Sequence, residues 1–443
     1  MHVPALAAGE APARRRSLIL AGGGMRVAYQ AGVLRALEED ALRFVHADGT
    51  SGGTINLAML LSGLSPAEMV ERWRTLRVRD FVSFLPLTRY LRRPKMMALG
   101  DADGLVGRVY PHLGIDVSRI RAARGIEGTF NVCNFDEKTN VAVPHVEVDL
   151  DLLVAGVSLP IFMPPVERDG TLYVDSVWIK DANPGEALRR GCDELWLVWC
   201  IGNSNAYRPG FLNEYVHMIE LSANGGLFEE LGHLQREAVG PLPRLHVIKP
   251  EYPLPLDPDF YFGRIDADAL VAMGYRDAKA YLAKRSEEGV AWDAAATRMR
   301  DQPRGVAFSK RLRGSVGGAR VELRVRTDLR DFARFDDRHP AELVGVLDHE
   351  RLGRGLLAKS GSFWLDGRRQ VYDLVFDQAG AELRLELRGG AAKLATGETG
   401  RLRLGLRNRL RFLSTIQPTG TDSVAARLRI VWRLLRLIGF GLR

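Results

Sequence analysis

The sequence is poor in cysteine and has no long hydrophobic run. Its three cysteines, Cys133, Cys192 and Cys200, are odd in number and form no CxxC pair, so we expect a reducing compartment and no disulfide framework. The longest apolar stretch, residues 152–166, is interrupted by prolines and is shorter than the ~20 residues that span a bilayer. The apolar run after residues 14–16 is too short for a signal peptide. These features predict a cytoplasmic protein, with peripheral attachment to the inner membrane surface left open.

Signatures of bound cofactors are also scarce. The sequence has no cluster of histidine, cysteine and carboxylate residues at metal-ligand spacing, so we expect neither a metal nor another cofactor. Apolar residues make up 46% and charged residues 26% of the chain, which is the balance of a soluble globular protein. Because 443 residues are too many for one ordinary core, at least two domains are expected.

Acidic residues are depleted only in the C-terminal third. The whole chain has 62 Lys and Arg against 54 Asp and Glu, a net charge of +8. From Asp301 onward there are 28 basic against 16 acidic residues, a balance of +12, so the first 300 residues carry −4. The C-terminal third is therefore expected to face an acidic partner surface.

Strand-like and helix-like segments alternate over the first 200 residues. The expected strands are residues 17–21, 44–47, 129–133, 172–174 and 195–199, and the first two expected helices are residues 27–40 and 54–61. Alternation of this kind predicts a mostly parallel sheet covered by helices on both faces. Residues 66–95 form a helix-rich insertion, rich in arginine and aromatics, that could overhang a site. A helical pattern resumes at residues 267–283 and continues to Asp301.

After Asp301 the hydrophobic period changes to two. Apolar residues alternate with polar ones around residues 321–325, 372–376, 383–387 and 402–406, which is typical of antiparallel strands with one wet face. We place the domain boundary near residues 302–305. The expected organisation is a flexible N-terminus (1–14), an α/β domain (15–300), a β-rich accessory domain (305–420) and a basic amphipathic helix (424–443).

Two glycine clusters carry the chemistry. The first consists of Gly22, Gly23 and Gly24 followed by Met25 and Arg26; it follows a strand and opens a helix, where backbone N–H groups can meet negative charge. The second, Gly49-Thr50-Ser51-Gly52-Gly53, fits G-x-S-x-G, in which a sharp turn exposes the serine hydroxyl. Two consecutive strand-to-helix turns would place a nucleophile beside an oxyanion-binding loop.

A serine nucleophile needs a base. The downstream histidines lack a triad-like setting; they are His112, His145, His217, His233 and His246. A carboxylate at a strand end could act directly on the serine if it is shielded enough to be basic. Asp175, at the end of the strand Thr171–Val174, fits that description, although an Asp at this place could also simply cap a turn.

These motifs resemble the patatin-like phospholipases. That family has a glycine-rich GGGxR loop, a G-x-S-x-G elbow and a catalytic Asp at a strand end, and here the matching residues are 21–26, 49–53 and 174–176. Residues 155–165 resemble the small-residue and proline segment that precedes the family's Asp. The resemblance covers about residues 15–285. It implies a three-layer α/β/α fold, a Ser51–Asp175 dyad, an acyl-enzyme, an oxyanion hole at residues 22–26 and lipid ester substrates.

Two departures from the family pattern leave alternatives open. Val27 and Ser176 stand where the family usually has glycine, and Asn183-Pro184 lies about one residue farther from Asp175 than expected. Asp181 is therefore a rival for the catalytic carboxylate. A non-catalytic lipid-binding or scaffold protein on the same fold is the first alternative function. The second is a nucleotide-binding protein with Asp48 as a ribose-binding acid, although a P-loop lysine is lacking.

The C-terminal segment combines arginines with large apolar residues. On a helix, Arg429, Arg433 and Arg436 share one face, and Trp432 lies among the apolar residues that cover much of the rest. This pattern is typical of an interfacial helix on an anionic membrane, but also of a terminal helix that packs on its own domain. Nucleic acid is not expected as a partner, because no nucleic-acid motif is present.

Overall fold

The computed structural model describes residues 3–7, 14–77, 102–207, 209–255, 265–332, 335, 338–378, 380–390, 393–396, 400–421 and 423–438. Most of the expected N-terminal tail (1–14) lies outside these residues. The same is true of residues 78–95 of the expected insertion and of the end of the expected C-terminal helix, residues 439–443.

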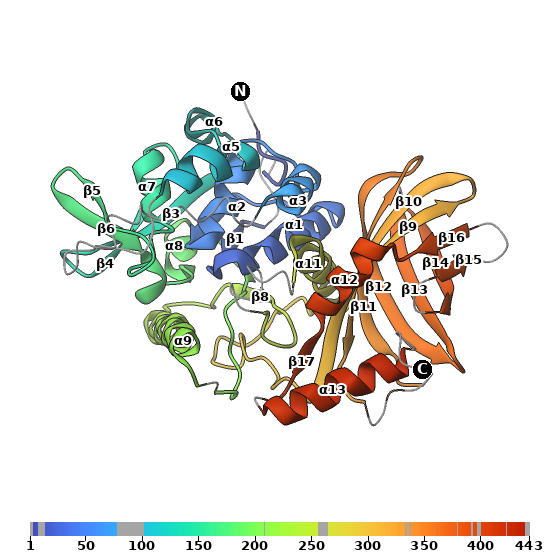
Figure 1. Cartoon of the computed structure of the whole chain (residues 1–443). Coiled ribbons are helices and arrows are strands. Elements are labelled where there is room, and N and C mark those ends of the chain that lie inside the picture. Colours follow the sequence, from blue (N-terminus) through green and yellow to red (C-terminus); the bar gives the residue numbers. More distant parts are fainter. Residues whose placement is uncertain are drawn as a thin grey trace.

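The N-terminal domain is built on an eight-stranded sheet (Figure 1). Its strands are β1 (Arg16–Leu20), β2 (His46–Thr50), β3 (Glu127–Asn134), β4 (Thr139–Pro144), β5 (Val166–Arg168), β6 (Thr171–Asp175), β7 (Glu194–Val198) and β8 (Arg244–Ile248). Along the sheet the order is β5-β6-β3-β2-β1-β7-β8, with β4 paired to β3. The five strands from β3 to β8 in this order run parallel, and β4, β5 and β6 pair antiparallel at one end.

The strands of this sheet are buried on both faces. In β1, Leu18 and Leu20 point into one core, whereas Ile19 and the following Ala21 point into another. The first core is covered by α1 (Ala28–Glu39), α2 (Gly52–Leu61), α3 (Pro66–Thr75), α5 (Tyr110–Leu113), α6 (Val117–Ala122), α7 (Leu150–Ala155), α11 (Ala267–Leu282) and the short helix η3 (Leu105–Val109). The second is covered by α8 (Pro184–Arg189) and α9 (Phe211–Glu237). This three-layer arrangement confirms the expected fold class.

Several expected elements are shifted or wrong. The second strand covers residues 46–50 instead of 44–47, because Phe44 is used by a short parallel bridge to Ala7. The helical pattern expected to continue to Asp301 ends with α11 at Leu282. The chain turns at Gly289, which has a φ of 78°, and Val290 then pairs with Leu245 of β8. The 27-residue helix α9 is not among the elements expected from the sequence.

The C-terminal domain is an antiparallel sheet that closes on itself (Figure 1). Its strands are β9 (Gly305–Val316), β10 (Ala319–Leu329), β11 (Ala341–His349), β12 (Gly353–Asp366), β13 (Arg369–Gln378), β14 (Ala381–Gly390), β15 (Lys393–Thr396), β16 (Gly400–Arg403) and β17 (Gln417–Thr419). Closure comes from β9, which pairs with both β10 and β16. The alternating apolar residues fill its interior, as the period of two predicts.

The strand expected over residues 402–406 is only half correct. Strand β16 ends at Arg403, and Leu406 begins the helix α12 (Leu406–Thr415). This helix is held on β9 by the side-chain amide of Asn408, which donates to the carbonyl of Arg311, and by Phe412, which is buried in the core of the closed sheet. Packing of Phe412 therefore overrides the two-residue period.

The last helix, α13 (Val424–Leu437), docks on the C-terminal domain with one side. Leu434 is buried in the core, as is Ile438 just after the helix, and the Ile438 carbonyl accepts a hydrogen bond from the Gln370 side chain at 2.8 Å. A second apolar stripe stays exposed, with Leu428 at 65% and Trp432 at 53%. The packing interpretation of the sequence is thus confirmed for one side of the helix, whereas the membrane interpretation stays a prediction. Within the described ranges, no helix is long and apolar enough to cross a membrane.

The helix α11 joins the two domains. It packs against α1 on one side and against β11 and β12 on the other (Figure 1). Val344, Val346 and Leu357 of the C-terminal sheet belong to the first core of the N-terminal domain. The three cysteines, all free thiols, are buried in the N-terminal domain.

Candidate active site

Ser51 lies in the turn between β2 and α2. Its backbone has a φ of 51° and a ψ of −129°, a region that non-glycine residues adopt only when their surroundings enforce it. The turn also brings the backbone of Gly53 very close to that of β1, because a Cβ added to Gly53 would lie 2.0 Å from the Leu20 carbonyl oxygen. The G-x-S-x-G pattern therefore reflects a strained turn that holds the serine at the end of its strand.

The glycine-rich loop lies directly beside Ser51. Gly22 has no room for a side chain, since an added Cβ would lie 2.8 Å from Cβ of Ser51. The loop then enters a short 3₁₀ helix, η1 (Gly24–Val27), which leads into α1.

Three polar side chains absent from the sequence analysis hold this loop. Gln30 donates to the Ala21 carbonyl at 2.6 Å, and Asn56 donates to the Val27 carbonyl and to Gln30, each at 2.9 Å. The Trp73 indole donates to Asn56 at 2.8 Å. All three side chains are buried, and buried polar residues on otherwise apolar helices are the signal that could have identified them.

Asp175 ends strand β6, which pairs with β3 on the side opposite to β2. Along β3, it lies next to the position of Thr50. Thr50, just before the elbow, pairs with Asn131, and Asp175 pairs with the next residue, Val132. The backbone amide of Asp175 donates to Ser158 at 3.1 Å, so the segment before β6 fixes this strand end. The register thus brings the two sequence candidates together.

The Asp175 carboxyl is fully buried. Burial raises its pKa to about 7, while hydrogen bonding from the Ser51 hydroxyl and the Val177 amide acts in the opposite direction. The Val177 amide donates to Oδ1 at 2.9 Å. Oδ2 of Asp175 has no hydrogen-bond partner among the described residues. A carboxylate of this basicity next to a hydroxyl is suited to accept its proton.

Asp181 lies directly beside the glycine-rich loop. Its Oδ1 accepts a hydrogen bond from the Gly22 amide at 3.1 Å, and its Oδ2 has no partner among the described residues. Burial, and then the nearby charge of Asp175, raise the pKa of Asp181 well above its usual range. The site therefore contains two buried carboxyl groups.

The side chains of Arg26 and Val27 stabilise the glycine-rich loop. The Arg26 guanidinium is buried, and its Nε donates to the Gly23 carbonyl at 3.0 Å. Val27 is fully buried, and its Cγ1 would lie 2.7 Å from a Cβ added to Gly52 of the elbow. The valine that departs from the family pattern packs the loop against the elbow. Within this arrangement, Arg26 stabilises the loop itself, and the Gly22 amide is already engaged by Asp181.

Comparison with known families agrees with this geometry. Residues 18–188 match the family model of patatin-like phospholipases. This part of the chain is a patatin-like phospholipase domain. The match runs from β1 into α8 and includes both glycine clusters and both buried carboxyls, and members of this family are lipid acyl hydrolases in general. No curated protein matches the chain.

Further buried polar residues of the patatin-like domain, Asp48 and Asn131 among them, form structural hydrogen bonds. Asp48 is fully buried and accepts from Thr129 at 2.6 Å and from Asn131 at 2.8 Å, so its carboxylate is not available to a ribose. The side-chain oxygen Oδ1 of Asn131 in turn accepts a hydrogen bond from the Asn183 side-chain amide at 2.8 Å, which connects the Asn-Pro segment to β3. This chain of contacts disfavours a dinucleotide site.

The histidines form their hydrogen bonds and ion pairs with residues other than Ser51. His46 contacts the hydroxyls of Ser17 and Thr129, and burial lowers its pKa to about 4. The downstream histidines interact with Arg72, Gly128, Glu220, Glu237 and Tyr281. In the part of the chain that the structure describes, no group of three His, Cys, Asp or Glu side chains is placed to hold a metal ion.

An apolar groove is lined by residues close in sequence to Asp175, although Asp175 and Ser51 themselves do not line it. It has a volume of about 570 Å³ and is lined by Val174 and Trp178, which flank the acid in sequence, and by side chains from α9 and the 160–161 segment. Tyr215 of α9 donates to the Pro160 carbonyl at 2.9 Å and closes one side. At the mouth, Phe211 is 80% and Met218 is 56% exposed.

Proposed function

We propose that this protein is a serine lipid acyl hydrolase that cleaves carboxylic esters through a Ser51–Asp175 dyad. The observation that carries the proposal is the proximity of a serine in a strained elbow to a fully buried carboxylate whose pKa is raised to about 7. A buried acid with that pKa is ionised to a substantial degree near neutral pH, yet basic enough to accept a hydroxyl proton.

The reaction proceeds in two acyl-transfer steps. Ser51 Oγ attacks the ester carbonyl while Asp175 takes its proton, and the negative charge that develops on the carbonyl oxygen is held by backbone N–H groups of Gly23, Gly24 and Gly52. The alcohol leaves with the proton from Asp175. Water, deprotonated by the same carboxylate, then attacks the acyl-enzyme and releases the fatty acid together with free Ser51.

The apolar groove is suited to bind the acyl chain of an ester substrate. Its walls are almost entirely apolar, and it begins at Val174 and Trp178, on either side of the acid. Burying a hydrocarbon chain stabilises the complex by about 0.8 kcal/mol for each CH₂ group. A long acyl ester should therefore bind more tightly than a short one, with the difference appearing in KM.

The exposed side of α13 favours binding of the protein to a membrane surface. Its exposed side presents Leu428 and Trp432 beside Arg429, Arg433 and Arg436. Apolar side chains flanked by arginines favour the interface of an anionic bilayer, where the substrate would also be found. The C-terminal domain would then bring the hydrolase to its lipid.

Labelling of the nucleophile tests the catalytic proposal. A fluorophosphonate should label the full chain at Ser51, and Ser51→Ala should lose both the label and the hydrolysis of p-nitrophenyl esters while its thermal unfolding stays close to that of the wild type. One observation favours the non-catalytic lipid-binding alternative, namely that the Gly22 amide is engaged by Asp181 instead of being open to an oxyanion. Absence of labelling in a folded wild-type protein would decide for that alternative.

A further inference from the structure

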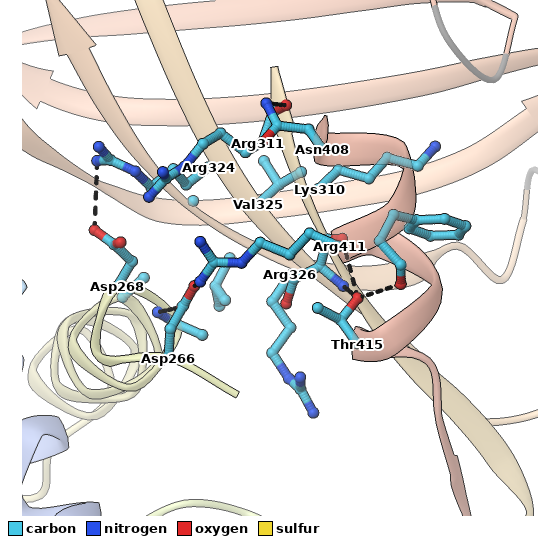
Figure 2. Close-up of a pocket in the computed structure, with 16 residues that line it drawn as sticks. Asp266, Asp268, Lys310, Arg311, Arg324, Val325, Arg326, Asn408, Arg411 and Thr415 are labelled. Carbon is cyan, nitrogen blue, oxygen red and sulfur yellow. Dashed lines mark hydrogen bonds and ion pairs between the residues drawn. The ribbon is translucent and has the colours of Figure 1, made fainter. Parts of the chain in front are cut away.

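A cavity lies between the two domains, away from the Ser51 site. It is bounded by the start of α11, by β9, β10 and β11, and by α12 (Figure 2). Its enclosed volume is about 30 Å³. This space suits a compact polar group and is too small for a whole lipid.

Positive charge dominates the walls of this cavity. Four arginines line it, Arg311, Arg324, Arg326 and Arg411, against two aspartates, Asp266 and Asp268. In Figure 2 the side chains of Arg311, Arg324 and Arg411 lie on the side of the aspartates, which come from the beginning of α11, whereas Arg326 points away from them and donates to Gln417 at 3.1 Å. Because α11 starts here, its N-terminal partial positive charge adds to that of the guanidinium groups.

Lys310 also lines this cavity, but its ammonium group lies in the core of the closed sheet. The Lys310 ammonium group donates to Gln370 and to Tyr372, both at 2.7 Å, inside the core of the closed sheet. Burial lowers the pKa of Lys310 to about 7. We therefore assign the charge of the cavity to the arginines alone.

The nearby carboxylates are shared among more cations than they can neutralise. Asp268 lies 2.6 Å from Arg74 and 3.5 Å from Arg324, and its partner in the lining, Asp266, contacts Arg411 at 3.5 Å while its other oxygen caps α11.

Behind the lining, Glu322 is likewise divided between Arg324 at 2.6 Å, Arg311 at 3.3 Å and Arg313 at 2.6 Å, and Asp348 is divided between Arg74 and Arg324. Burial and the repulsion from Arg324 and Arg411 lower the pKa of Arg311. The arginines thus crowd one another, which an anion would relieve.

Two hydrogen-bond donors on the lining lack a partner. They are the hydroxyl of Ser309 and Nε of Arg324, both without a hydrogen bond among the described residues. The backbone around Ser309 is fixed by Thr415, whose hydroxyl accepts from the Ser309 amide at 3.0 Å and donates to its carbonyl at 3.2 Å. Buried donors of this kind normally have partners, so their presence in a cationic cavity indicates a missing acceptor.

We propose that this interdomain cavity binds a phosphoryl group, held by the guanidinium groups of Arg311, Arg324 and Arg411 and by the Ser309 hydroxyl. Phosphate oxygens match the forked donors of arginine, and a phosphoryl group is compact enough for the space. The group could belong to a small soluble phosphate ester or to the headgroup of a lipid. All four of these donors belong to β9, β10 and α12 of the C-terminal domain, and the start of α11 from the N-terminal domain closes the cavity.

The test uses the full chain and soluble phosphates first. Sodium phosphate and glycerol 3-phosphate should raise the melting temperature by a few degrees over sodium chloride of equal ionic strength, because a ligand bound only to the folded state stabilises it. In Arg311→Gln and Arg411→Gln the apparent Kd for phosphate should be at least tenfold weaker. The side chain of Arg411 is 48% exposed, so the second variant is expected to fold even if the first does not.

The control is Arg384→Gln, which removes an arginine that is 63% exposed on β14 and pairs with Asp373, and it should leave the phosphate effect unchanged. Vesicles that contain phosphatidic acid distinguish the source: co-sedimentation that weakens in Arg411→Gln indicates a lipid headgroup, and a response to soluble phosphate alone indicates a small ester. No stabilisation by any of these probes, or equal stabilisation of the Arg411→Gln variant, would overturn the proposal. None of these measurements depends on hydrolysis at Ser51.

Discussion

The carboxylate of Asp181 accepts a hydrogen bond from the amide of Gly22 at 3.1 Å, although Gly22 belongs to the loop that faces the nucleophile. The same carboxyl lies close enough to Asp175 for the two to repel each other electrostatically. Two carboxyls that share a buried site do not both ionise readily, so one of them retains its proton at neutral pH. Burial and the charge of Asp175 raise the pKa of Asp181 well above its usual range, which favours Asp181 as the protonated partner and Asp175 as the base.

Paired substitutions separate the roles of these two acids. Asp181→Asn keeps the shape of a protonated carboxyl and its acceptor for Gly22, so kcat for a soluble ester should stay within about threefold of the wild type. Asp175→Asn removes the base and should lower kcat by about 10²–10⁴-fold. Steady-state kinetics on both variants gives the comparison, and the reverse pattern would make Asp181 the catalytic acid.

The pH dependence of hydrolysis follows from the raised pKa of Asp175. The base must be unprotonated to accept the Ser51 proton, so kcat/KM should rise with pH through about 7 and level off above it. With an ordinary, unburied carboxylate the rise would occur near pH 4. A pH–rate profile of the wild type distinguishes the two, since a flat profile between pH 5 and 8 is incompatible with a buried base.

The same shift predicts a change in stability with pH. Because the folded state holds the Asp175 proton more tightly than the unfolded chain does, the free energy of unfolding should fall as pH rises from about 4 through 7. Asp175→Asn abolishes this contribution, so the variant should gain stability over the wild type at pH 8 and show little difference at pH 4. Chemical denaturation at the two pH values measures the effect; a variant that is less stable at pH 8 would contradict it.

Two adjacent glycines of α9 should respond oppositely to alanine. A Cβ on Gly225 meets nothing within 4 Å, so Gly225→Ala should stabilise the helix by about 0.5–1 kcal/mol. A Cβ on Gly226 would lie 2.8 Å from the Ile179 carbonyl oxygen, between the two acids in sequence, so Gly226→Ala should destabilise by about 1–3 kcal/mol. Denaturation midpoints give the sign of each change, and Gly225→Ala serves as the matched control.

Membrane binding should depend on the exposed side of α13. Truncation would also remove Leu434 and Ile438 from the core, so point substitutions are the cleaner test. The double variant Leu428→Gln, Trp432→Gln should bind anionic vesicles roughly tenfold more weakly while hydrolysing a soluble ester normally. Leu352→Gln, at a turn of the C-terminal domain, is the control for loss of an exposed leucine. Unchanged vesicle binding in the double variant would exclude this helix as the membrane contact.

Much of the framework was predictable from local sequence. The alternation of Val321, Leu323 and Val325 with charged residues predicted the antiparallel strands, and the two glycine clusters predicted the turns that hold Ser51, because each signal depends only on neighbours along the chain. The closure of the sheet through β9, the long helix α9 and the helix beginning at Leu406 were not predicted. Each depends on packing between segments that are distant in sequence.

The sequence by itself determined the α/β class, the resemblance to patatin-like phospholipases and the pair of candidate acids. Only the tertiary structure decided how those acids differ. The register of β3 brings Asp175 to the level of Ser51, while Asp181 folds back onto Gly22, 159 residues earlier in the chain. The pKa of a carboxyl depends on burial and on neighbouring charges, and these are set by contacts between distant segments, which a motif does not specify.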